Sequence, residues 1–274
     1  TSLTTEQFIE NVNRIGIAIM GQTADLAPAD KKLYALRDVT ATVDNMSLIA
    51  SSIMSKKLAA GADAIVLDVK TGSGAFMKSR EDAFALAEEM VKIGKNAGRK
   101  TIAVISDMDQ PLGRSVGNAL EVKEAIATLR GEGPKDFTEL CMVLGSQMLM
   151  AGGKALSVEQ AREALTKVIE DGSALRKLSE FVEAQGGDPK AVTDPSLLPK
   201  ASMVVPVCAD RDGFVGRIAC EDVGICSLLL GGGRETKESK IDLSVGILLE
   251  KKKGDAVKKG DVLGYLHAND EQRL

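Results

Sequence analysis

The sequence predicts an α/β protein with a mixed sheet flanked by helices, a small helical lobe and a C-terminal β-rich domain. Three observations lead to this fold class. Residues 64–106 show a buried strand, an amphipathic helix and a second buried strand, which is the spacing of a βαβ unit. Two helical patterns precede this unit, and from Ser202 the chain changes to short strands and turns. We therefore expect an α/β domain at residues 1–28 and 61–200, a helical lobe at residues 29–60 and a β-rich domain at residues 201–274.

The first element is a short helix, which Thr4 or Thr5 can cap with a hydroxyl oxygen. Residues 16–21 then form an apolar run between two glycines, and we interpret this run as a buried strand. Residues 29–39 and 45–58 follow as a pair of helices.

The second helix of this pair carries the first chemically informative residues. Asp44 or Asn45 can cap it, and Ser52 and Lys56 lie four residues apart, so they share one side of the helix beside its apolar stripe. A hydroxyl and an ammonium in this position can meet a flat, polar ligand. Arg37, on the preceding helix, can add a planar fork of donors. The alternative is a surface helix whose lysine is only solvated.

Residues 64–69 and 101–106 read as buried strands, joined by an amphipathic helix that ends at Ala97. In a parallel sheet, functional residues gather beyond the carboxyl ends of the strands. The loops that start at Lys70 and Asp107 are therefore expected at the edge of a site.

The loop of residues 70–78 is rich in glycine and resembles a phosphate cradle at first sight. It lacks the Gly-Lys-Ser/Thr sequence of a P-loop and the third glycine of a dinucleotide fingerprint. Two interpretations remain open from the residues alone, a phosphate site and a tight turn that glycine permits.

The next loop, from Asp107, is punctuated by glycine and proline and enters a helix near Asn118 that includes Glu124. Three further helices are expected at residues 134–151, 157–170 and 173–183, and a linker is expected at residues 192–200.

In the C-terminal region, the Lys253–Leu263 run resembles the barrel of biotinyl and lipoyl carriers. No lysine follows Lys259, so we interpret it as a scaffold. Arg234 lies in a glycine-rich loop that is either a solvated turn or an anion site.

Composition narrows the classes of protein. Hydrophobic residues make up 44% and charged residues 27%, with no apolar window long enough for a membrane span. A net charge of −4 and an aromatic content of 3% without Trp argue against nucleic-acid binding. One His and four Cys without a C-x-x-C pair make a zinc site unexpected. We expect free thiols and a cytoplasmic location.

Four segments together resemble one family. They are Tyr34–Thr40 (Y-A-L-R-D-V-T), Ser51–Lys57 (S-S-I-M-S-K-K), Asp68–Lys78 (D-V-K-T-G-S-G-A-F-M-K) and Met108–Val122 (M-D-Q-P-L-G-R-S-V-G-N-A-L-E-V). They are similar to the pyrimidine-nucleoside phosphorylases, the family that includes thymidine phosphorylase, and the resemblance runs along essentially the whole chain in the family's order. No segment resembles the family's phosphate-binding Lys-His-Ser-Thr-Gly-Gly sequence. We therefore expect the chain to correspond to the C-terminal portion of such an enzyme.

The resemblance implies a two-lobed nucleoside phosphorylase-type fold with the substrate cleft between the lobes. It also implies a glycosyltransferase reaction, the reversible phosphorolysis of uridine, thymidine or deoxyuridine to the free base and (deoxy)ribose 1-phosphate. By resemblance, Arg37, Ser52 and Lys56 are the catalytic and base-binding residues. Arg37 and Lys56 stabilise the departing base, Ser52 fixes its orientation, and Phe76 and Met77 pack against the pyrimidine ring.

The family also binds a monovalent cation, normally potassium. The resemblance places its ligands at the backbone carbonyls of Leu112 and Ser115 and at the carboxylate of Glu124, with further ligands in the phosphate-binding segment. Ser115 stands where the family often has alanine, which matters little because a carbonyl binds whatever the side chain. Phosphate is the co-substrate and no organic cofactor is implied. A homodimer through the helical lobe and a role in pyrimidine salvage follow from the same resemblance.

Two other functions remain as alternatives. One is a phosphoribosyltransferase of the anthranilate type, which shares the two-lobed architecture but needs acidic residues for magnesium and diphosphate. The other is a folded fragment without catalytic activity. Without the phosphate-binding sequence, we expect this chain to be inactive alone. The residues do not distinguish specificity for thymidine from acceptance of uridine as well.

Overall fold

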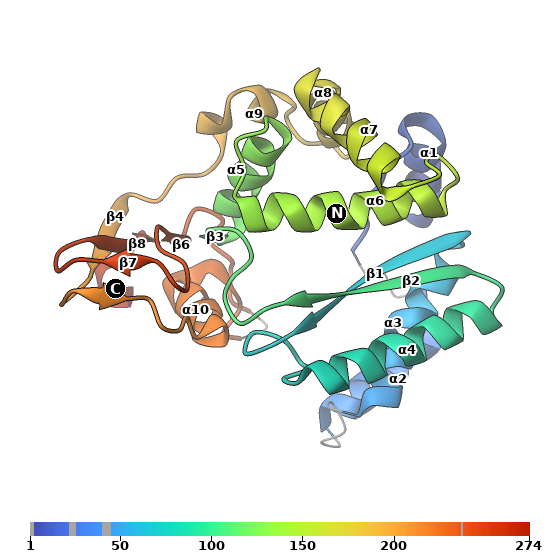
Figure 1. Cartoon of the computed structure of the whole chain (residues 1–274), viewed down its shortest axis with the longest axis horizontal. Coiled ribbons are helices and arrows are strands. Elements are labelled where there is room, and N and C mark those ends of the chain that lie inside the picture. The colour runs from blue at the N-terminus through green and yellow to red at the C-terminus, as the bar shows by residue number, and fades with distance from the viewer. Residues whose placement is uncertain (1–2, 22–25, 40–44, 237) are drawn as a thin grey trace. The chain divides into compact units, whose positions relative to one another are not determined.

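A computed structural model describes residues 3–21, 26–39, 45–236 and 238–274, and only the backbone of residues 34–39 (Figure 1). The chain forms two compact units. The first comprises Thr1–Lys70, Ser79–Ser106 and Met142–Pro189, and the second comprises Thr71–Lys78, Asp107–Cys141 and Lys190–Leu274. The predicted fold class is confirmed, since helices accompany a β1-α4-β2 unit and the C-terminal part is rich in β-structure. The domain boundaries given above stay a prediction.

The first unit is mostly helical and contains two neighbouring strands. Its elements are α1 (Thr5–Ile15), α2 (Pro28–Val39), α3 (Met46–Ala59), β1 (Ala64–Thr71), α4 (Arg80–Asn96), β2 (Lys100–Asp107), the second part of α6 (Lys135–Ala151), α7 (Val158–Glu170) and α8 (Ser173–Ala184).

Helix α1 begins and ends at residues that favour helix termini. Thr4 and Gln7 form a reciprocal capping box, and Gly16 ends the helix with a left-handed φ of 79°. The strand predicted at residues 16–21 is wrong. Ile19 is 53% exposed, and both its N–H and its C=O pair with the side-chain amide of Gln185 rather than with a neighbouring strand. An apolar run does not become a strand unless a second backbone lies beside it.

The N-terminal caps of α3, α4 and α7 follow the sequence pattern. Asn45 caps α3 by accepting from the N–H of Leu48, and Ser79 caps α4 by accepting from the N–H of Asp82. Ser157 caps α7 in the same way. Each cap satisfies an N–H that has no partner within its own helix.

Strands β1 and β2 form a two-stranded sheet. The N–H of Lys100 pairs with Asp63 O at one end and the N–H of Met108 pairs with Thr71 O at the other, so the strands run parallel. Alternate residues of β1 are buried, and the apolar ones among them are Ile65, Leu67 and Val69. Helix α4 runs along this sheet (Figure 1) and buries Ala83, Leu86, Ala87 and Met90. The βαβ unit expected from the sequence is therefore present.

The second unit holds most of the β-structure. Its elements are β3 (Ser115–Val116), α5 (Asn118–Leu129), the first part of α6, α9 (Lys190–Thr193), β4 (Met203–Cys208), β5 (Gly213–Phe214), α10 (Cys220–Ser227), β6 (Gly246–Leu249), β7 (Ala256–Val257) and β8 (Val262–Ala268), with short turns of helix at Pro195–Leu197, Leu228–Gly232 and Glu271–Arg273.

Its main sheet has the strand order β3-β6-β8-β4, and all its pairs are antiparallel. The short strand β3 belongs to the loop after β2, so this early loop is part of the C-terminal sheet. A core of Leu230, Val245, Ile247 and Ala268 lies against the sheet. Strands β5 and β7 form a separate antiparallel pair.

Two general features bear on function. Among the described residues no cysteine forms a disulfide bond, and Cys220 is buried whereas Cys141, Cys208 and Cys226 are exposed. Among the residues that the structure describes, no helix combines the length and the apolar character that crossing a bilayer requires.

The contact between α4 and β2 gives a test of the fold. A Cβ on Gly94 would lie 2.0 Å from Oγ1 and 2.8 Å from Cβ of Thr101, which belongs to β2. We expect Gly94→Ala to lower the free energy of unfolding by about 1–3 kcal/mol, because the helix must move away from the strand. Urea unfolding of the purified chain measures this change.

Gly224→Ala is the matched control, because Gly224 lies within α10 with nothing near the added Cβ. Because alanine has a higher helix propensity than glycine, this substitution stabilises the helix by up to about 1 kcal/mol. A Gly94→Ala protein as stable as the unsubstituted chain would contradict the described packing of α4 on β2.

Candidate active site

The side chains of Ser52 and Lys56 meet on α3, as their spacing predicts. Lys56 Nζ donates to Ser52 Oγ at 2.8 Å and to Asp30 Oδ2 at 2.9 Å. Asp30 lies in the first turn of α2, and its side chain is 8% exposed, against 26% for Lys56. A half-buried ammonium is therefore held in place by a buried carboxylate and a hydroxyl.

The local sequence explains this arrangement. Ile49, Ala50 and Met54 are buried on the apolar side of α3, and Ser52 is buried beside them. Ser52 Oγ accepts from Lys56, and a hydroxyl that accepts one hydrogen bond can still donate its own proton. Asp30 also lies at a helix N-terminus, where a negative charge is favoured. Asp30 offsets part of the charge of Lys56, as a contacting carboxylate must, but the ammonium is held in a fixed position next to a hydroxyl donor.

Arg37 lies in α2, and its side chain falls outside the described residues. Its predicted part in base binding therefore stays a prediction.

The glycine-rich loop after β1 is a tight turn whose N–H groups already have partners. The N–H of Gly72 donates to Met77 O, and the N–H of Ser73 donates to Asp109 Oδ1. The N–H of Gly74 donates to Met108 O, and that of Ala75 to Gly72 O, with all four distances between 2.9 and 3.1 Å. A phosphate cradle needs such N–H groups to point at the ligand. The loop therefore fits the tight-turn interpretation rather than the phosphate interpretation.

Close packing explains the two glycines of this turn. Gly72 has a φ of 118°, and a Cβ there would lie 2.7 Å from Asp109 Oδ1. A Cβ on Gly74 would lie 2.5 Å from the sulfur of Cys220. Glycine is required at these positions by the approach of Asp109 and Cys220.

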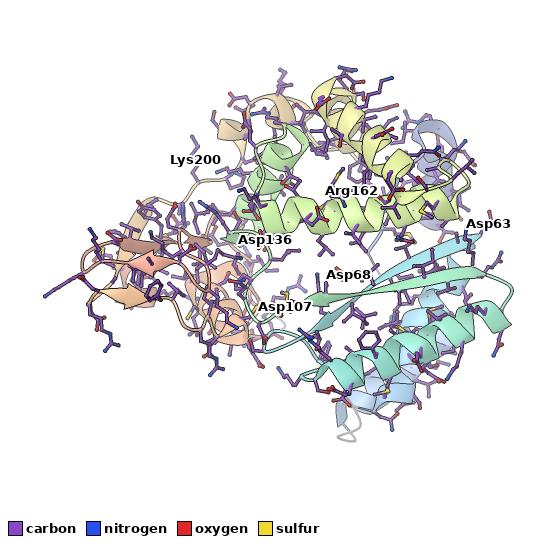
Figure 2. The ribbon with its side chains drawn as sticks, in the orientation of Figure 1. Asp63, Asp68, Asp107, Asp136, Arg162 and Lys200 are labelled. Carbon is purple, nitrogen blue, oxygen red and sulfur yellow. The ribbon has the colours of Figure 1, made fainter. Side chains whose placement is uncertain are left out.

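Lys70 does not offer a free cation to a phosphate. Its ammonium lies 2.7 Å from Asp68 Oδ2, and the hydroxyl of Ser106 donates to the other oxygen of this carboxylate. Figure 2 shows Asp68 on β1. Asp68 therefore neutralises much of the charge of Lys70.

Phe76 and Met77, predicted to pack against a ring, differ in exposure. Phe76 is 76% exposed, whereas Met77 is 8% exposed and its backbone bridges to Thr71. The exposed phenyl ring is available to a flat ligand, and Met77 is part of the structural core of the turn.

The loop after β2 carries the predicted cation ligands. Glu124 Oε1 accepts from the N–H of Arg114 at 2.9 Å and of Ser115 at 3.2 Å, and Gly113, with a φ of 68°, leaves room for the other oxygen of the carboxylate. Ser115 belongs to β3 and Leu112 precedes it in the loop. The described residues contain no cluster of three or more His, Cys, Asp or Glu suited to a metal ion. A cation here would depend on backbone carbonyls together with Glu124, and oxygen donors of this kind suit hard cations.

Asp136, in the first turn of α6 (Figure 2), supports the same loop. Its Oδ2 accepts from the N–H of Gly113 at 3.2 Å and lies 3.0 Å from the ammonium of Lys252. Burial alone would raise the pKa of Asp136. Hydrogen bonding and charge from Lys252, together with the N–H groups of Phe137 and Gly113, outweigh this effect and lower the pKa. Asp136 is therefore an anion at neutral pH.

Two other titratable groups are unsuited to covalent or acid–base chemistry. Burial raises the pKa of the Cys220 thiol, so it stays protonated and is a poor nucleophile. Burial, followed by the nearby charge of Lys123, lowers the pKa of His267, and its Nε2 is buried without a hydrogen-bond partner. Neither group points to a nucleophilic mechanism.

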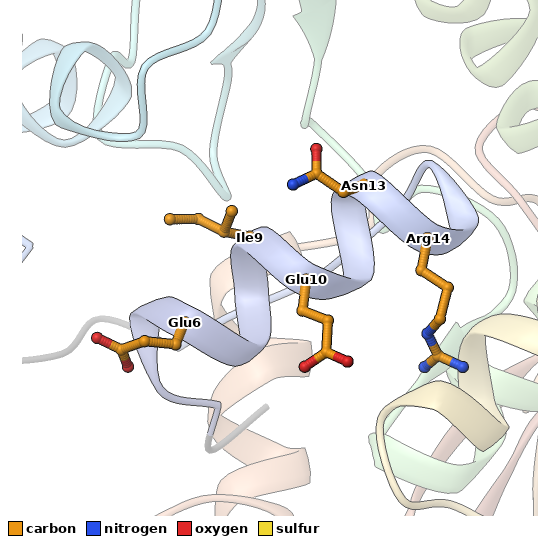
Figure 3. Close-up of a pocket in the computed structure, with 5 residues that line it drawn as sticks. All are labelled: Glu6, Ile9, Glu10, Asn13 and Arg14. Carbon is orange, nitrogen blue, oxygen red and sulfur yellow. The ribbon is translucent and has the colours of Figure 1, made fainter.

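A shallow hollow lies on one face of α1 (Figure 3). It is lined by residues of this one helix, which are Glu6, Ile9, Glu10, Asn13 and Arg14. Within the part of the chain that the structure describes, no second element contributes a group to it, so it shows none of the convergence of side chains that marks a binding site.

The sequence did not reveal Asp30, Asp109, Asp136 or Lys252. Asp30 follows Pro28 in a recognisable helix start, and Asp109 lies within the Met108–Val122 segment that resembles the family. The others find partners that are distant along the chain, and no local pattern marks such pairs.

Comparisons with known proteins identify the family of this chain. A model described as the glycosyl transferase family, a/b domain, matches residues 1–175, and a pyrimidine nucleoside phosphorylase C-terminal domain matches residues 214–274. Proteins named pyrimidine-nucleoside phosphorylase are 60% identical over 270 residues in Geobacillus stearothermophilus and 58% identical over 269 residues in Bacillus subtilis (strain 168) and in Staphylococcus haemolyticus (strain JCSC1435). Each alignment covers 98% of this chain and 62% of the relative, so the chain spans less than two thirds of the length of these relatives.

The hydrogen bonds of Lys56 predict an energetic coupling with Asp30. We expect Asp30→Asn and Lys56→Met each to lower the free energy of unfolding by about 1–3 kcal/mol, because each leaves a partly buried partner without its counter-charge. The double variant should lose less than the sum, with a coupling of about 0.5–3 kcal/mol. Urea unfolding of the four proteins measures this coupling.

Lys57→Met is the control, because Lys57 is the exposed neighbour of Lys56 and makes no described contact with Asp30. Losses that simply add in the double variant would show that the ion pair is not formed in solution.

Proposed function

The chain belongs to the glycosyl transferase family with an α/β domain, and within it to the pyrimidine-nucleoside phosphorylases, and we propose that it contributes the base-binding residues for the reversible phosphorolysis of pyrimidine nucleosides. The observation that carries this proposal is the 60% identity, over 98% of the chain, to a protein named for this reaction. The ordered charge of Lys56 supports it from the structure.

In the proposed reaction, a phosphate oxygen forms a bond to the anomeric carbon while the bond from this carbon to the base nitrogen breaks. The bonding electrons go to the base, which leaves as an anion and then takes up a proton. Negative charge therefore develops on the ring nitrogen and on its carbonyl oxygens. No covalent intermediate with the protein is needed, in keeping with the protonated thiol of Cys220.

Lys56 suits the stabilisation of this charge. Asp30 and Ser52 hold its ammonium at 2.9 and 2.8 Å, so it needs little reorganisation when charge develops on the base. Ser52 orients the ring by a hydrogen bond, and Asp30 acts as a positioning residue for Lys56. Arg37 completes the set of donors, and Phe76 contributes apolar contact to the ring. Groups arranged in this way help most in the transition state.

The proposal includes a potassium ion held by the carbonyls of Leu112 and Ser115 and by Glu124. Glu124 already fixes the N–H groups of Arg114 and Ser115, which supports a preformed loop at this position. The ion would supply charge that orders the loop.

The same proposal covers the setting of the protein. The co-substrate is phosphate, the protein pairs as a homodimer through the helices of residues 29–60, and it works in pyrimidine salvage in the cytoplasm. The similarity to the bacterial relatives supports this setting.

Activity tests the proposal. A version of the chain extended at its N-terminus with the family's phosphate-binding segment should release uracil from uridine in excess phosphate. Arg37→Ala and Lys56→Ala should each lower kcat/KM by about ten- to a hundredfold, since each removes a charge-assisted hydrogen bond of roughly 1.5–3 kcal/mol. The 274-residue chain alone should show no release above background.

Lys57→Ala is the matched control and should keep full activity. Normal turnover in both the Arg37 and the Lys56 variants would remove these residues from the site, and an inactive extended protein would contradict the proposed reaction.

The potassium site has a separate test. We expect potassium to raise the Tm of the extended protein relative to an equal concentration of tetramethylammonium, and Glu124→Gln to reduce this rise by at least half, because a neutral amide binds a cation less well. Glu121→Gln is the control, because this neighbouring carboxylate of α5 accepts from the N–H of Gly117 and, among the described residues, from no N–H of the Leu112–Ser115 loop. An unchanged potassium response in Glu124→Gln would exclude the site.

A further inference from the structure

The ammonium of Lys252 lies in a cage of three oxygens within the second unit. It donates to the carbonyls of Pro111 and Gly113 and lies 3.0 Å from Asp136 Oδ2. A lysine ammonium has three donors, and these three acceptors use all of them. The side chain is 18% exposed, so water competes little for the ammonium.

The cage organises the backbone on both sides of Gly113. The N–H of Gly113 donates to Asp136, while its carbonyl accepts from Lys252. Two backbone carbonyls that converge on one point repel each other unless a cation lies between them. The shape of residues 111–115 therefore depends on a positive charge at this position.

Lys252 is itself held in position. Its N–H donates to Asp255 Oδ2 at 2.8 Å within a tight turn, and the N–H of Lys253 donates to the side chain of Gln110 at 3.0 Å. The turn that carries Lys252 is thus attached to the loop both by its backbone and by its ammonium. The attachment joins residues that are 141 positions apart in the sequence.

We propose that Lys252 provides a built-in cation for the loop of residues 111–115, and that truncation of its side chain opens a site for a primary alkylammonium ion. This oxygen set, with two carbonyls and one carboxylate, offers three acceptors to the three donors of an ammonium ion. The inference is independent of the proposed phosphorolysis, because it concerns the stability of the loop in this chain.

Three variants of the full chain test the proposal. Lys252→Met keeps most of the side-chain volume without the charge, and Lys252→Ala leaves the cage open. Lys253→Met is the control, since Lys253 is exposed and contributes only its backbone N–H. We expect both Lys252 variants to lower the Tm by about 5 °C. Amide exchange at residues 113–115 should accelerate about tenfold or more, and Lys253→Met should behave as the unsubstituted chain.

Chemical rescue separates a cation site from a general loss of packing. Butylammonium chloride, which replaces the four-carbon stem and the ammonium, should restore at least half of the lost Tm and amide protection in Lys252→Ala. Tetramethylammonium chloride, which cannot donate a hydrogen bond, should restore neither. Lys252→Met should respond to neither salt, because its side chain fills the space.

Several results would overturn the proposal. One is a Lys252→Met protein with the Tm and exchange of the unsubstituted chain, and this variant decides the question where Lys252→Ala does not fold. Another is a folded Lys252→Ala protein that butylammonium does not restore, or that both salts restore equally.

Discussion

The loops that follow β1 and β2 depend on one constraint, which is that backbone N–H and C=O groups outside regular structure need partners. The structure meets it mainly with charged side chains. Asp109 accepts from the N–H of Ser73 in the first loop, and Glu124 accepts from two N–H groups in the second. Lys252 donates to two carbonyls of that second loop. Charge-assisted hydrogen bonds of this kind are stronger than neutral ones, so they fix loops that have little secondary structure of their own.

The same principle shapes the candidate active site. Lys56 is useful to a departing base only if its ammonium stays in one place, and Asp30 and Ser52 ensure this. Asp30 is nearly buried, so its charge acts on Lys56 with little screening by water. This preorganisation links a short ion pair between two helices to the proposed chemistry.

The sequence predicted what local patterns specify. Strands β1 and β2, the helix between them and the caps at Asn45 and Ser157 follow from periodicity and side-chain oxygens near helix starts. The resemblance to the family, confirmed by the comparisons, added the candidate residues. Residues 16–21 failed as a strand because an apolar run does not specify a neighbour. The pairing of Lys56 with Asp30 and of Lys252 with Pro111 was not predictable, because these partners lie 26 and 141 residues away in the sequence.

Amide hydrogen exchange of the chain, measured with and without uracil, tests whether the residues around Lys56 receive a pyrimidine base, as we propose. We expect slower exchange in α2 (Pro28–Val39) and α3 (Met46–Ala59), with no change in α7 (Val158–Glu170). Unchanged exchange in α2 and α3 at saturating uracil, or protection confined to other elements, would contradict it.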